Sequence, residues 1–365
     1  MLVCQGSPER YSVIGARKLW IGLAVSVLLL VLFLATVDVG RMLESVADAN
    51  YFWLLPGIAL YLTSVLFRTL RWQVLLRHMR AVRVSRLYPV VVIGYMANNL
   101  LPMRIGELVR SYYVGEREGI SKTSALATIL IERVLDALTL LFFIAGIALF
   151  VPLGGLAEAF GDRFGVAWPL LVALVSLPFV VAFCALLLFA FNPARTQTVA
   201  LVLIGPLPRR FRTPLRGLIE MFLQGLVPLR SPRTLALLLL ISVPIWLFES
   251  ALFFCVGLAF GLDNVYDNLG EMAVANVLVT ATANIGSSVP GAPGGIGLFE
   301  LVARETLVVL PMAPVDRSVA GSFAVVVHAS LLLPMILLGQ VFLGLANTSL
   351  VKLYRAERDA GAGGR

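Results

Sequence analysis

Six long runs of apolar residues divide the chain, and most are long enough to cross a lipid bilayer as a helix. A membrane-spanning helix needs roughly 20 mainly apolar residues. The pattern therefore predicts an all-α polytopic membrane protein with six long transmembrane helices. The runs lie at about residues 19–36, 51–67, 123–151, 167–191, 234–260 and 319–346.

Two further apolar stretches are shorter and interrupted. One covers residues 88–101, stops at Pro102 and is followed by charged residues. The other covers residues 272–283, is broken by the Gly- and Pro-rich segment 286–297, and resumes at residues 298–310. No half of either stretch is long enough to span a membrane alone. We therefore predict two re-entrant helical hairpins, at about residues 88–120 and 272–310.

Composition agrees with a membrane protein and argues against several other classes. Hydrophobic residues make up 59% of the 365 residues and charged residues 14%, and the mean hydropathy is +0.92. A soluble domain averages about a quarter charged residues. The three cysteines and the two histidines, His78 and His328, show no metal-ligand spacing, so we expect no disulfide framework, metal or cofactor. The net charge is +8, and the basic residues are clustered in the loops between apolar runs. This distribution is typical of a membrane protein rather than of a nucleic-acid-binding protein.

Basic residues are concentrated in alternate loops. Residues 68–86 contain six arginines and no acid, and residues 192–233 contain seven arginines and one glutamate. The other loops are poor in bases. Because basic loops stay in the cytoplasm, we expect a plasma-membrane protein with both tails, residues 1–18 and 347–365, in the cytoplasm. The basic segment 192–233 is amphipathic, so we expect it to lie on the anionic cytoplasmic leaflet.

This topology requires each hairpin to return to the side on which it starts, and it divides the chain into two repeats of opposite orientation. The first repeat covers residues 19–151 and the second residues 152–346. Pro102-Met-Arg-Ile-Gly106 matches Pro293-Gly-Gly-Ile-Gly297, and Glu-Leu-Val follows each pentad. Paired interrupted segments in the two halves of an inverted-topology repeat indicate a transporter binding site near the membrane midplane.

The segment from Asn284 to Gly297 is rich in Gly and Pro, which frees backbone groups that hydrocarbon does not satisfy. Such backbone survives at membrane depth where protein buries it or where it lines a wet cavity. The N–H groups of the helix that restarts near Gly295 carry partial positive charge and suit a lipid phosphate. The alternative is an ordinary exposed loop. The candidate substrate-binding residues are Asn284, Ser287, Ser288, Gly294, Gly295, Gly297 and Glu300.

The first hairpin supplies the counterpart, with Asn98, Asn99, Arg104 and Glu107 as candidate substrate-binding residues. A guanidinium group can bind phosphate with two hydrogen bonds. Glu107 can pair with Arg104 or contact a cationic headgroup. The alternative is that Arg104, Glu107 and Arg110 form a solvated cytoplasmic helix face.

Glu132, Arg133 and Asp136 lie inside the third long run. A charge near the centre of a membrane helix costs about 2.5–3.5 kcal/mol on insertion scales, so these side chains should face partners or a wet cavity. Arg133 and Asp136 are three residues apart and can pair. They can either staple helices together or contact substrate. Glu249 is open to protonation, proton coupling or pairing with an arginine, and His328 is expected to be a hydrogen-bond partner between helices.

Arg68, Arg71 and Trp72 close the second long run. We interpret them as interfacial anchors, because arginines at the end of a span extend to the surface and tryptophan favours the interface. The alternative is a headgroup-binding site.

Four motifs together resemble the lysylphosphatidylglycerol synthase transmembrane-region family, also called flippase-like proteins. The motifs are Arg68-x-x-Arg-Trp72, Asn98 to Glu107, Glu132-Arg-x-x-Asp136 and Pro290-Gly-x-Pro-Gly-Gly-x-Gly-x-x-Glu300. In two-part members of that family, a membrane domain translocates aminoacylated phosphatidylglycerol made by a cytoplasmic synthase domain. The resemblance covers residues 19–346 and the membrane domain alone. It therefore implies lipid transport without aminoacyl-transfer chemistry, and a free-standing member need not handle lysyl lipids.

Three functions compete. The chain can be a transporter that moves a phospholipid or related amphiphilic lipid between leaflets, a membrane-embedded enzyme acting on lipid or isoprenoid phosphates, or a scaffold for a separate lipid-modifying enzyme. The sequence has no ATP-binding motif. Its acids are scattered or close to arginine rather than gathered as an enzyme would need. We therefore expect a lipid transporter without enzymatic activity, with membrane lipids as partners and a lipid-modifying enzyme as an optional one.

Overall fold

The computed structural model describes residues 28, 30–31, 33–101, 105–151, 167–205, 209–288, 293–310, 312–313 and 315–346. Within these ranges the protein is helical and contains no strand. The α-helices are α2 (Val39–Asp48), α3 (Leu54–Leu76), α4 (Val84–Leu100), α5 (Gly106–Glu118), α6 (Lys122–Ala148), α8 (Trp168–Phe191), α9 (Pro193–Ile204), α10 (Arg209–Gly225), α11 (Pro232–Ala259), α12 (Leu269–Gly286), α13 (Leu298–Val309) and α14 (Arg317–Leu345). Short 3-10 turns are η1 (Tyr51–Trp53), η3 (Val227–Arg230), η4 (Leu262–Asn264) and η5 (Pro293–Gly295).

Four helical segments are long and apolar enough to cross a membrane by length and composition: Tyr51–Leu76, Val172–Phe191, Pro232–Ala259 and Arg317–Leu345. They match four of the six predicted spans. The third predicted span is the 27-residue helix α6, which carries Glu132, Arg133 and Asp136 in its middle. Most of the first predicted span lies outside the described residues.

Polar side chains fix where several of these helices begin. Ser121, Ser231, Asn268 and Asp316 each accept a hydrogen bond from a backbone N–H in the first turn of α6, α11, α12 and α14, respectively. An N-cap of this kind satisfies N–H groups that have no partner inside the helix. Four long apolar helices therefore start at polar residues that terminate the preceding loop.

Helices α4 and α5 form a tightly packed hairpin, here named hairpin 1. A Cβ atom on Gly106 would lie 1.9 Å from the carbonyl oxygen of Gly94, so the two backbones touch where the helices cross. The Asn98 side chain accepts a hydrogen bond from the N–H of Gly106 at 2.8 Å. At the far ends of the two helices, Arg86 of α4 lies 3.6 Å from the carboxylate of Glu118 on α5. The start and the end of hairpin 1 therefore lie together.

Helices α12 and α13, with η5 between them, form hairpin 2. The hydroxyl groups of Thr282 on α12 and Thr306 on α13 are 2.9 Å apart, which places the helices side by side. Gly294, Gly295 and Gly297 have positive φ angles of 63°, 76° and 91°. Residues with a side chain rarely adopt positive φ angles, so this turn requires glycine. The predicted Gly/Pro break therefore occurs where the sequence placed it.

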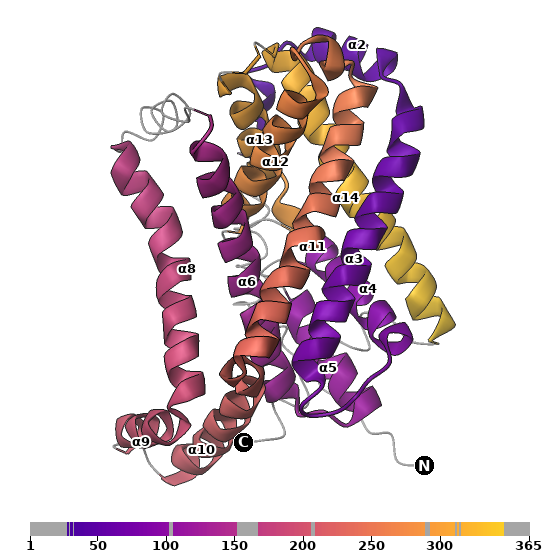
Figure 1. The fold of residues 1–365 in the computed structure, drawn as a ribbon. Coiled ribbons are helices and arrows are strands. Elements are labelled where there is room, and N and C mark those ends of the chain that lie inside the picture. Colours follow the sequence, from indigo (N-terminus) through magenta and orange to yellow (C-terminus); the bar gives the residue numbers. More distant parts are fainter. Residues whose placement is uncertain are drawn as a thin grey trace, which may run out of the picture.

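The two hairpins occupy opposite ends of the molecule, and their tips meet. Figure 1 shows α5 near the lower end of the bundle and α12 and α13 near the upper end. Hairpin 1 contacts hairpin 2 between α4 and η5. A Cβ atom on Gly294 would lie 3.4 Å from the carbonyl oxygen of Asn99. The C-terminal end of α4 and the turn η5 are thus neighbours in space.

The two ends of the bundle also differ in charge. Helices α9 and α10, which belong to the arginine-rich segment 192–233, lie at the lower end in Figure 1. Helix α2 lies at the opposite end, as do the adjoining ends of α11 and α12. The connection between these two helices carries Asp263 and Asp267, and Glu271 follows in the first turn of α12. Helix α8 runs beside α6 and stands apart from the rest of the bundle.

Candidate functional site between the two hairpins

A buried arginine joins three helices at the centre of the bundle. Arg68 of α3 donates a 2.7 Å hydrogen bond to Glu249 of α11 and a 3.5 Å hydrogen bond to Asp136 of α6. Its guanidinium group also lies 4.5 Å from the centre of the Trp246 ring. An arginine can make such contacts simultaneously because its planar group carries five N–H donors and stacks on aromatic rings.

Asp136 collects further positive charge. Arg71, one turn after Arg68 on α3, donates to Asp136 at 2.7 Å and to the Ser242 hydroxyl of α11 at 2.8 Å. The Arg133 guanidinium lies 3.2 Å from Asp136 on the same helix. The predicted pairing of Arg133 with Asp136 is confirmed. It is one contact of a larger cluster.

This cluster extends to both hairpins. On one side, Arg133 lies 3.8 Å from the Glu107 carboxylate on α5 of hairpin 1. On the other side, Asn284 on α12 of hairpin 2 donates to Glu249 at 3.1 Å. A continuous line of polar contacts therefore links hairpin 1 to hairpin 2, and we name it the polar chain. Its members, in order, are Glu107, Arg133, Asp136, Arg68, Glu249 and Asn284.

The charges of the polar chain balance. With Arg71 included, three arginines face three carboxylates. Buried charges are costly unless they are paired and hydrogen-bonded, and removing one partner of a buried pair leaves an uncompensated charge. The arrangement therefore ties five helices, α3, α5, α6, α11 and α12, to one another.

Each hairpin has a second tie to the long helix that follows it in sequence. In hairpin 1, Arg110 lies 2.9 Å from Glu132 of α6 and 4.2 Å from the centre of the Trp72 ring. In hairpin 2, Glu300 lies 2.7 Å from Nδ1 of His328 on α14. The two halves of the chain thus repeat one pattern, in which the second hairpin helix pairs with the next long helix.

The structure corrects the interpretation of Arg68, Arg71 and Trp72 as interfacial anchors. Their exposed fractions are 5%, 0% and 0%, and both arginines are held in buried ion pairs. The Trp72 indole N–H donates to the Thr128 hydroxyl at 3.0 Å rather than reaching a headgroup region. Because these side chains are enclosed by protein, they do not extend to a membrane surface.

One of the glycine N–H groups expected to bind phosphate already has a partner. The N–H of Gly297 donates to Glu300 at 2.7 Å, so it is occupied in this conformation, contrary to our expectation. Gly295 lies in the turn before α13 with a φ of 76°. Ser288 donates to the Asn284 carbonyl at 2.8 Å, and Ser287 donates to it at 3.3 Å. Both serines therefore close the end of α12.

The remaining candidates are placed as follows. Asn98 holds the start of α5, and the backbone of Asn99 faces Gly294. Arg104 lies outside the described residues. Glu132 is buried against Arg110, so of the two open interpretations of this residue the structure shows the helix-stapling contact.

Two contacts of the site were missed by sequence reasoning. The first is the pairing of Arg110 with Glu132, since we had considered Arg110 only in the alternative of a solvated helix face. Arg304 of α13 is fully buried, lies 2.6 Å from Glu305 and donates to the Phe33 carbonyl at 3.0 Å. The cost of a charge in an apolar segment is the signal that would have marked Arg304 in advance.

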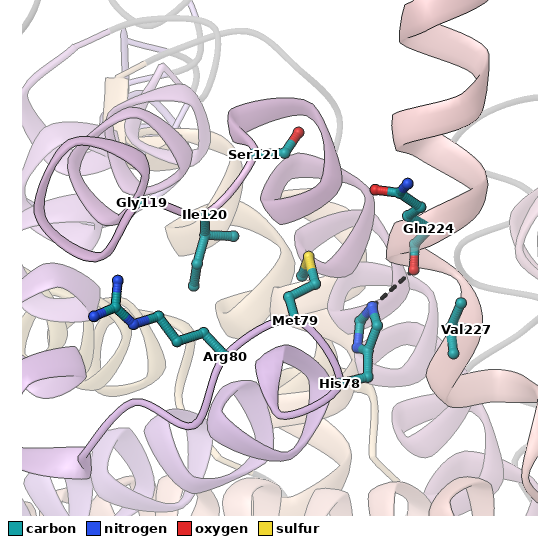
Figure 2. Close-up of a pocket in the computed structure, with 8 residues that line it drawn as sticks. All are labelled: His78, Met79, Arg80, Gly119, Ile120, Ser121, Gln224 and Val227. Carbon is teal, nitrogen blue, oxygen red and sulfur yellow. Dashed lines mark hydrogen bonds between the residues drawn. The ribbon is translucent and has the colours of Figure 1, made fainter.

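A separate pocket of about 350 Å³ lies where the end of α3, the turn between α5 and α6, and the end of α10 come together (Figure 2). His78 forms part of its wall, and the His78 Nε2 atom lies 2.8 Å from the Gln224 carbonyl oxygen. Arg80 and Ser121 line other parts of the wall. Its lining includes no member of the polar chain, so this pocket is distinct from the site between the hairpins. Among the described residues, no group of His, Cys, Asp and Glu could hold a metal ion.

The helical architecture, the apolar spans and the buried balanced charges define a multi-pass membrane protein. Residues 19–339 match the family described as the lysylphosphatidylglycerol synthase transmembrane region, and the chain belongs to that family.

Curated relatives agree with this assignment. The chain is 27% identical over 327 residues to the glycosyltransferase AglD of Haloferax volcanii, a match that covers 84% of the chain and 51% of AglD. It is 25% identical over 320 residues to a UPF0104 membrane protein of Methanothermobacter thermautotrophicus, which covers 83% of the chain and 88% of that protein. A UPF0104 membrane protein of Methanocaldococcus jannaschii, MJ1595, is 28% identical over 124 residues. The chain thus spans about half of AglD but most of the Methanothermobacter protein.

Proposed function

We propose that this protein transports a membrane lipid between leaflets, with the lipid headgroup bound where the two hairpin tips meet. The observation that carries this proposal is the polar chain, which runs from Glu107 on hairpin 1 to Asn284 on hairpin 2. Charged groups inside a membrane protein usually face partners or a substrate path. A chain of ion pairs between the two hairpins provides contacts that can break on one side while they persist on the other.

The proposal includes re-entrant hairpins in an inverted-topology repeat. Their position at opposite ends of the bundle supports it, as does the matched pairing of Arg110 with Glu132 and of Glu300 with His328. The arginine-rich end is assigned to the cytoplasm by the positive-inside rule, which places both termini there in a plasma-membrane protein. Transport then consists of alternate opening of hairpin 1 to the cytoplasm and hairpin 2 to the exterior.

The proposed ligand group is the lipid phosphate. The backbone of the turn at Gly295 leads into α13, whose N-terminal end carries partial positive charge. Arg104 belongs to the matched pentad of hairpin 1 and is proposed as the guanidinium donor on the other side. Together with Arg71, the polar chain has no net charge. We therefore propose that a charged headgroup binds at the start of α13 and at Arg104 rather than at the buried pairs.

The relative AglD is named a glycosyltransferase, which supports a second candidate, a membrane part that serves a separate enzyme. In that case the chain would bind lipid and a separate enzyme without moving headgroups. We favour transport without catalysis because the carboxylates of the polar chain are each engaged by arginine. A general acid or nucleophile would need at least one of them to be available.

Reconstitution of the purified protein in liposomes separates the candidates. Headgroup-labelled phospholipids, among them phosphatidylglycerol and phosphatidylethanolamine, are supplied in the liposome membrane, and a membrane-impermeant quencher reports which leaflet holds each label. Transport predicts protein-dependent movement of at least one labelled headgroup with no change in its chemical structure. A modified lipid would instead support an enzyme, and the absence of both would support the scaffold.

A further inference from the structure

Two hydrogen bonds of His328 fasten the tip of hairpin 2 to α14, and a third bond inside hairpin 2 continues from them. The Nε2 atom of His328 lies 2.9 Å from the carbonyl oxygen of Gly294, and its Nδ1 atom lies 2.7 Å from Oε1 of Glu300. The second oxygen of Glu300 accepts the N–H of Gly297 at 2.7 Å. The His328 ring stacks on Phe299 at 4.2 Å between ring centres. Both ionisable side chains are buried.

Hydrogen-bond valence fixes the number of protons in this arrangement. A backbone carbonyl only accepts, so Nε2 of His328 must carry a proton to bond Gly294. A neutral imidazole has one N–H, so its Nδ1 atom would then be an acceptor. An ionised Glu300 is also an acceptor, and two acceptors cannot bond at 2.7 Å. The contact therefore requires one more proton, on either Nδ1 or the carboxyl group, and the pair is then neutral as a whole.

We propose that Glu300 and His328 form a proton-binding site and that the proton is the coupling ion of transport, an inference that rests on the proposed function. With the proton bound, the tip of hairpin 2 is closed onto α14. When the proton leaves, the remaining N–H of His328 can serve either Glu300 or Gly294 but not both. One contact becomes repulsive, and the tip is released.

Release at this point acts directly on the substrate path. Gly294 is the residue of hairpin 2 whose added Cβ would touch the Asn99 carbonyl of hairpin 1. The bond that depends on the proton therefore holds the place where the two hairpins meet. For the proton to be the coupling ion, it must leave to the cytoplasmic side while hairpin 1 is open, and another proton must bind from the exterior while hairpin 2 is open. One proton then crosses the membrane in each transport cycle.

The surroundings of His328 leave Glu300 as its partner. Helices α2, α3, α4, α11 and α13 pack against α14. Among the described residues of these helices, Glu300 is the ionisable group within hydrogen-bond distance of the His328 ring. The other ionisable side chains of these helices are Arg41, Glu44 and Asp48 of α2, Tyr61, Arg68 and Arg71 of α3, Arg86, Tyr88 and Tyr95 of α4, Arg233, Glu249 and Cys255 of α11, and Arg304 and Glu305 of α13.

Glu300→Gln separates proton binding from structure. A glutamine amide can donate to Nδ1 of a neutral His328 while its oxygen accepts the N–H of Gly297, so the variant imitates the proton-bound pair and should fold normally. The glutamine amide does not titrate, so the variant cannot release a proton as the wild-type pair can. Asp263→Asn is the matched control, because it removes one exposed carboxylate from the same end of the bundle.

The test uses liposomes that contain headgroup-labelled phosphatidylglycerol and a trapped pH-sensitive dye, at a series of pH values. We expect wild type and Asp263→Asn to move headgroups at a pH-dependent rate, approaching the limit of about tenfold per pH unit set by one titrating proton, with proton movement across the membrane. Glu300→Gln should move headgroups at least about tenfold more slowly, without pH dependence. A pH-independent wild type, or a Glu300→Gln protein that keeps the wild-type rate and pH dependence, would overturn the proton-binding proposal. No headgroup movement by wild type at any pH would instead count against the proposed function.

A second readout is independent of transport. The chain has two histidines, so ¹⁵N-histidine labelling in lipid nanodiscs gives two imidazoles, and His78→Gln assigns them. In wild type the ring nitrogens of His328 should respond to pH, whereas in Glu300→Gln they should remain those of a neutral ring protonated at Nε2. A wild-type His328 whose Nε2 atom carries no proton across the titration would overturn the proton-binding site, whatever the lipid assay shows.

Discussion

The guanidinium group of Arg68 donates to the carboxylate of Glu249 at 2.7 Å, and this contact joins α3 to α11 inside the bundle. The residues are 181 positions apart in sequence. Because Glu249 also accepts from Asn284, the same carboxylate connects the centre of the bundle to hairpin 2. The pair therefore connects the part of the polar chain near hairpin 1 to the part near hairpin 2.

Removing Glu249 should destabilise the protein more than removing an exposed acid. Glu249→Leu leaves Arg68 with Asp136 at 3.5 Å as its remaining carboxylate, and loss of one partner of a buried pair costs about 3–5 kcal/mol. Glu220→Leu is the control, because Glu220 forms an exposed pair with Arg216 on α10 that is worth about 0.3–0.5 kcal/mol. Thermal unfolding in detergent measures both. Equal melting temperatures for the two variants would remove the buried pair from the account.

Asp136 should couple more strongly to Arg71 than to Arg133. Arg71 is fully buried and donates at 2.7 Å, whereas the Arg133 side chain is 26% exposed and lies 3.2 Å away. Double-mutant cycles with leucine replacements should give an interaction energy of roughly 0.5–3 kcal/mol for each pair, as is usual for contacting residues. The interaction energy should be larger for Arg71 with Asp136 than for Arg133 with Asp136. A larger coupling between Arg133 and Asp136 would mean that the pair within α6 dominates.

The crossing of α4 and α5 should not tolerate a methyl group at Gly106. A Cβ atom there would lie 1.9 Å from the Gly94 carbonyl oxygen, which is backbone and cannot move aside without separating the helices. Gly106→Ala should therefore lower the melting temperature and the folded yield. Gly146→Ala in α6 is the control, because no atom lies within 4 Å of the added group and alanine is favoured in a helix by about 1 kcal/mol. A neutral Gly106→Ala would show that hairpin 1 packs more loosely than described.

Each hairpin should start and end on one side of the membrane. In a background without the native cysteines, single cysteines at Ser85 and Glu116 flank hairpin 1, and those at Asp267 and Asp316 flank hairpin 2, all at exposed positions. A membrane-impermeant maleimide should label the first two from the cytoplasmic side and the last two from the exterior. Labelling of Ser85 and Glu116 from opposite sides would mean that hairpin 1 spans the membrane rather than re-entering it.

Local patterns in the sequence predicted the all-helical class, four of the apolar spans and one contact within a helix. The Gly/Pro break before α13 and the pairing of Arg133 with Asp136 were predicted because turn glycines and a three-residue spacing have direct structural meaning. The hydrogen-bonding role of His328 was also predicted and is confirmed by its contact with Glu300.

Contacts between distant segments were not predictable in the same way. Arg68 at the end of an apolar run has the same local pattern whether it extends to the membrane surface or pairs with Glu249 inside the bundle. The difference lies in the packing of α3 against α11, which the sequence near Arg68 does not encode. The occupied N–H of Gly297 was recognisable, because an acid three residues later, Glu300, is the acceptor expected for a helix start.

The most direct measurement is headgroup movement in liposomes by variants of the hairpin tips, at matched amounts of folded protein. Gly295→Val should be nearly inactive, because φ at Gly295 is 76° and an added Cβ would lie 3.2 Å from Ser287. Gly146→Val should keep the wild-type rate. Arg104→Ala should be nearly inactive and Arg104→Lys partly active, because lysine retains the charge but not the two-pronged geometry. If Gly295→Val and Arg104→Ala are well folded and both move headgroups at the wild-type rate, the lipid does not pass between the hairpins.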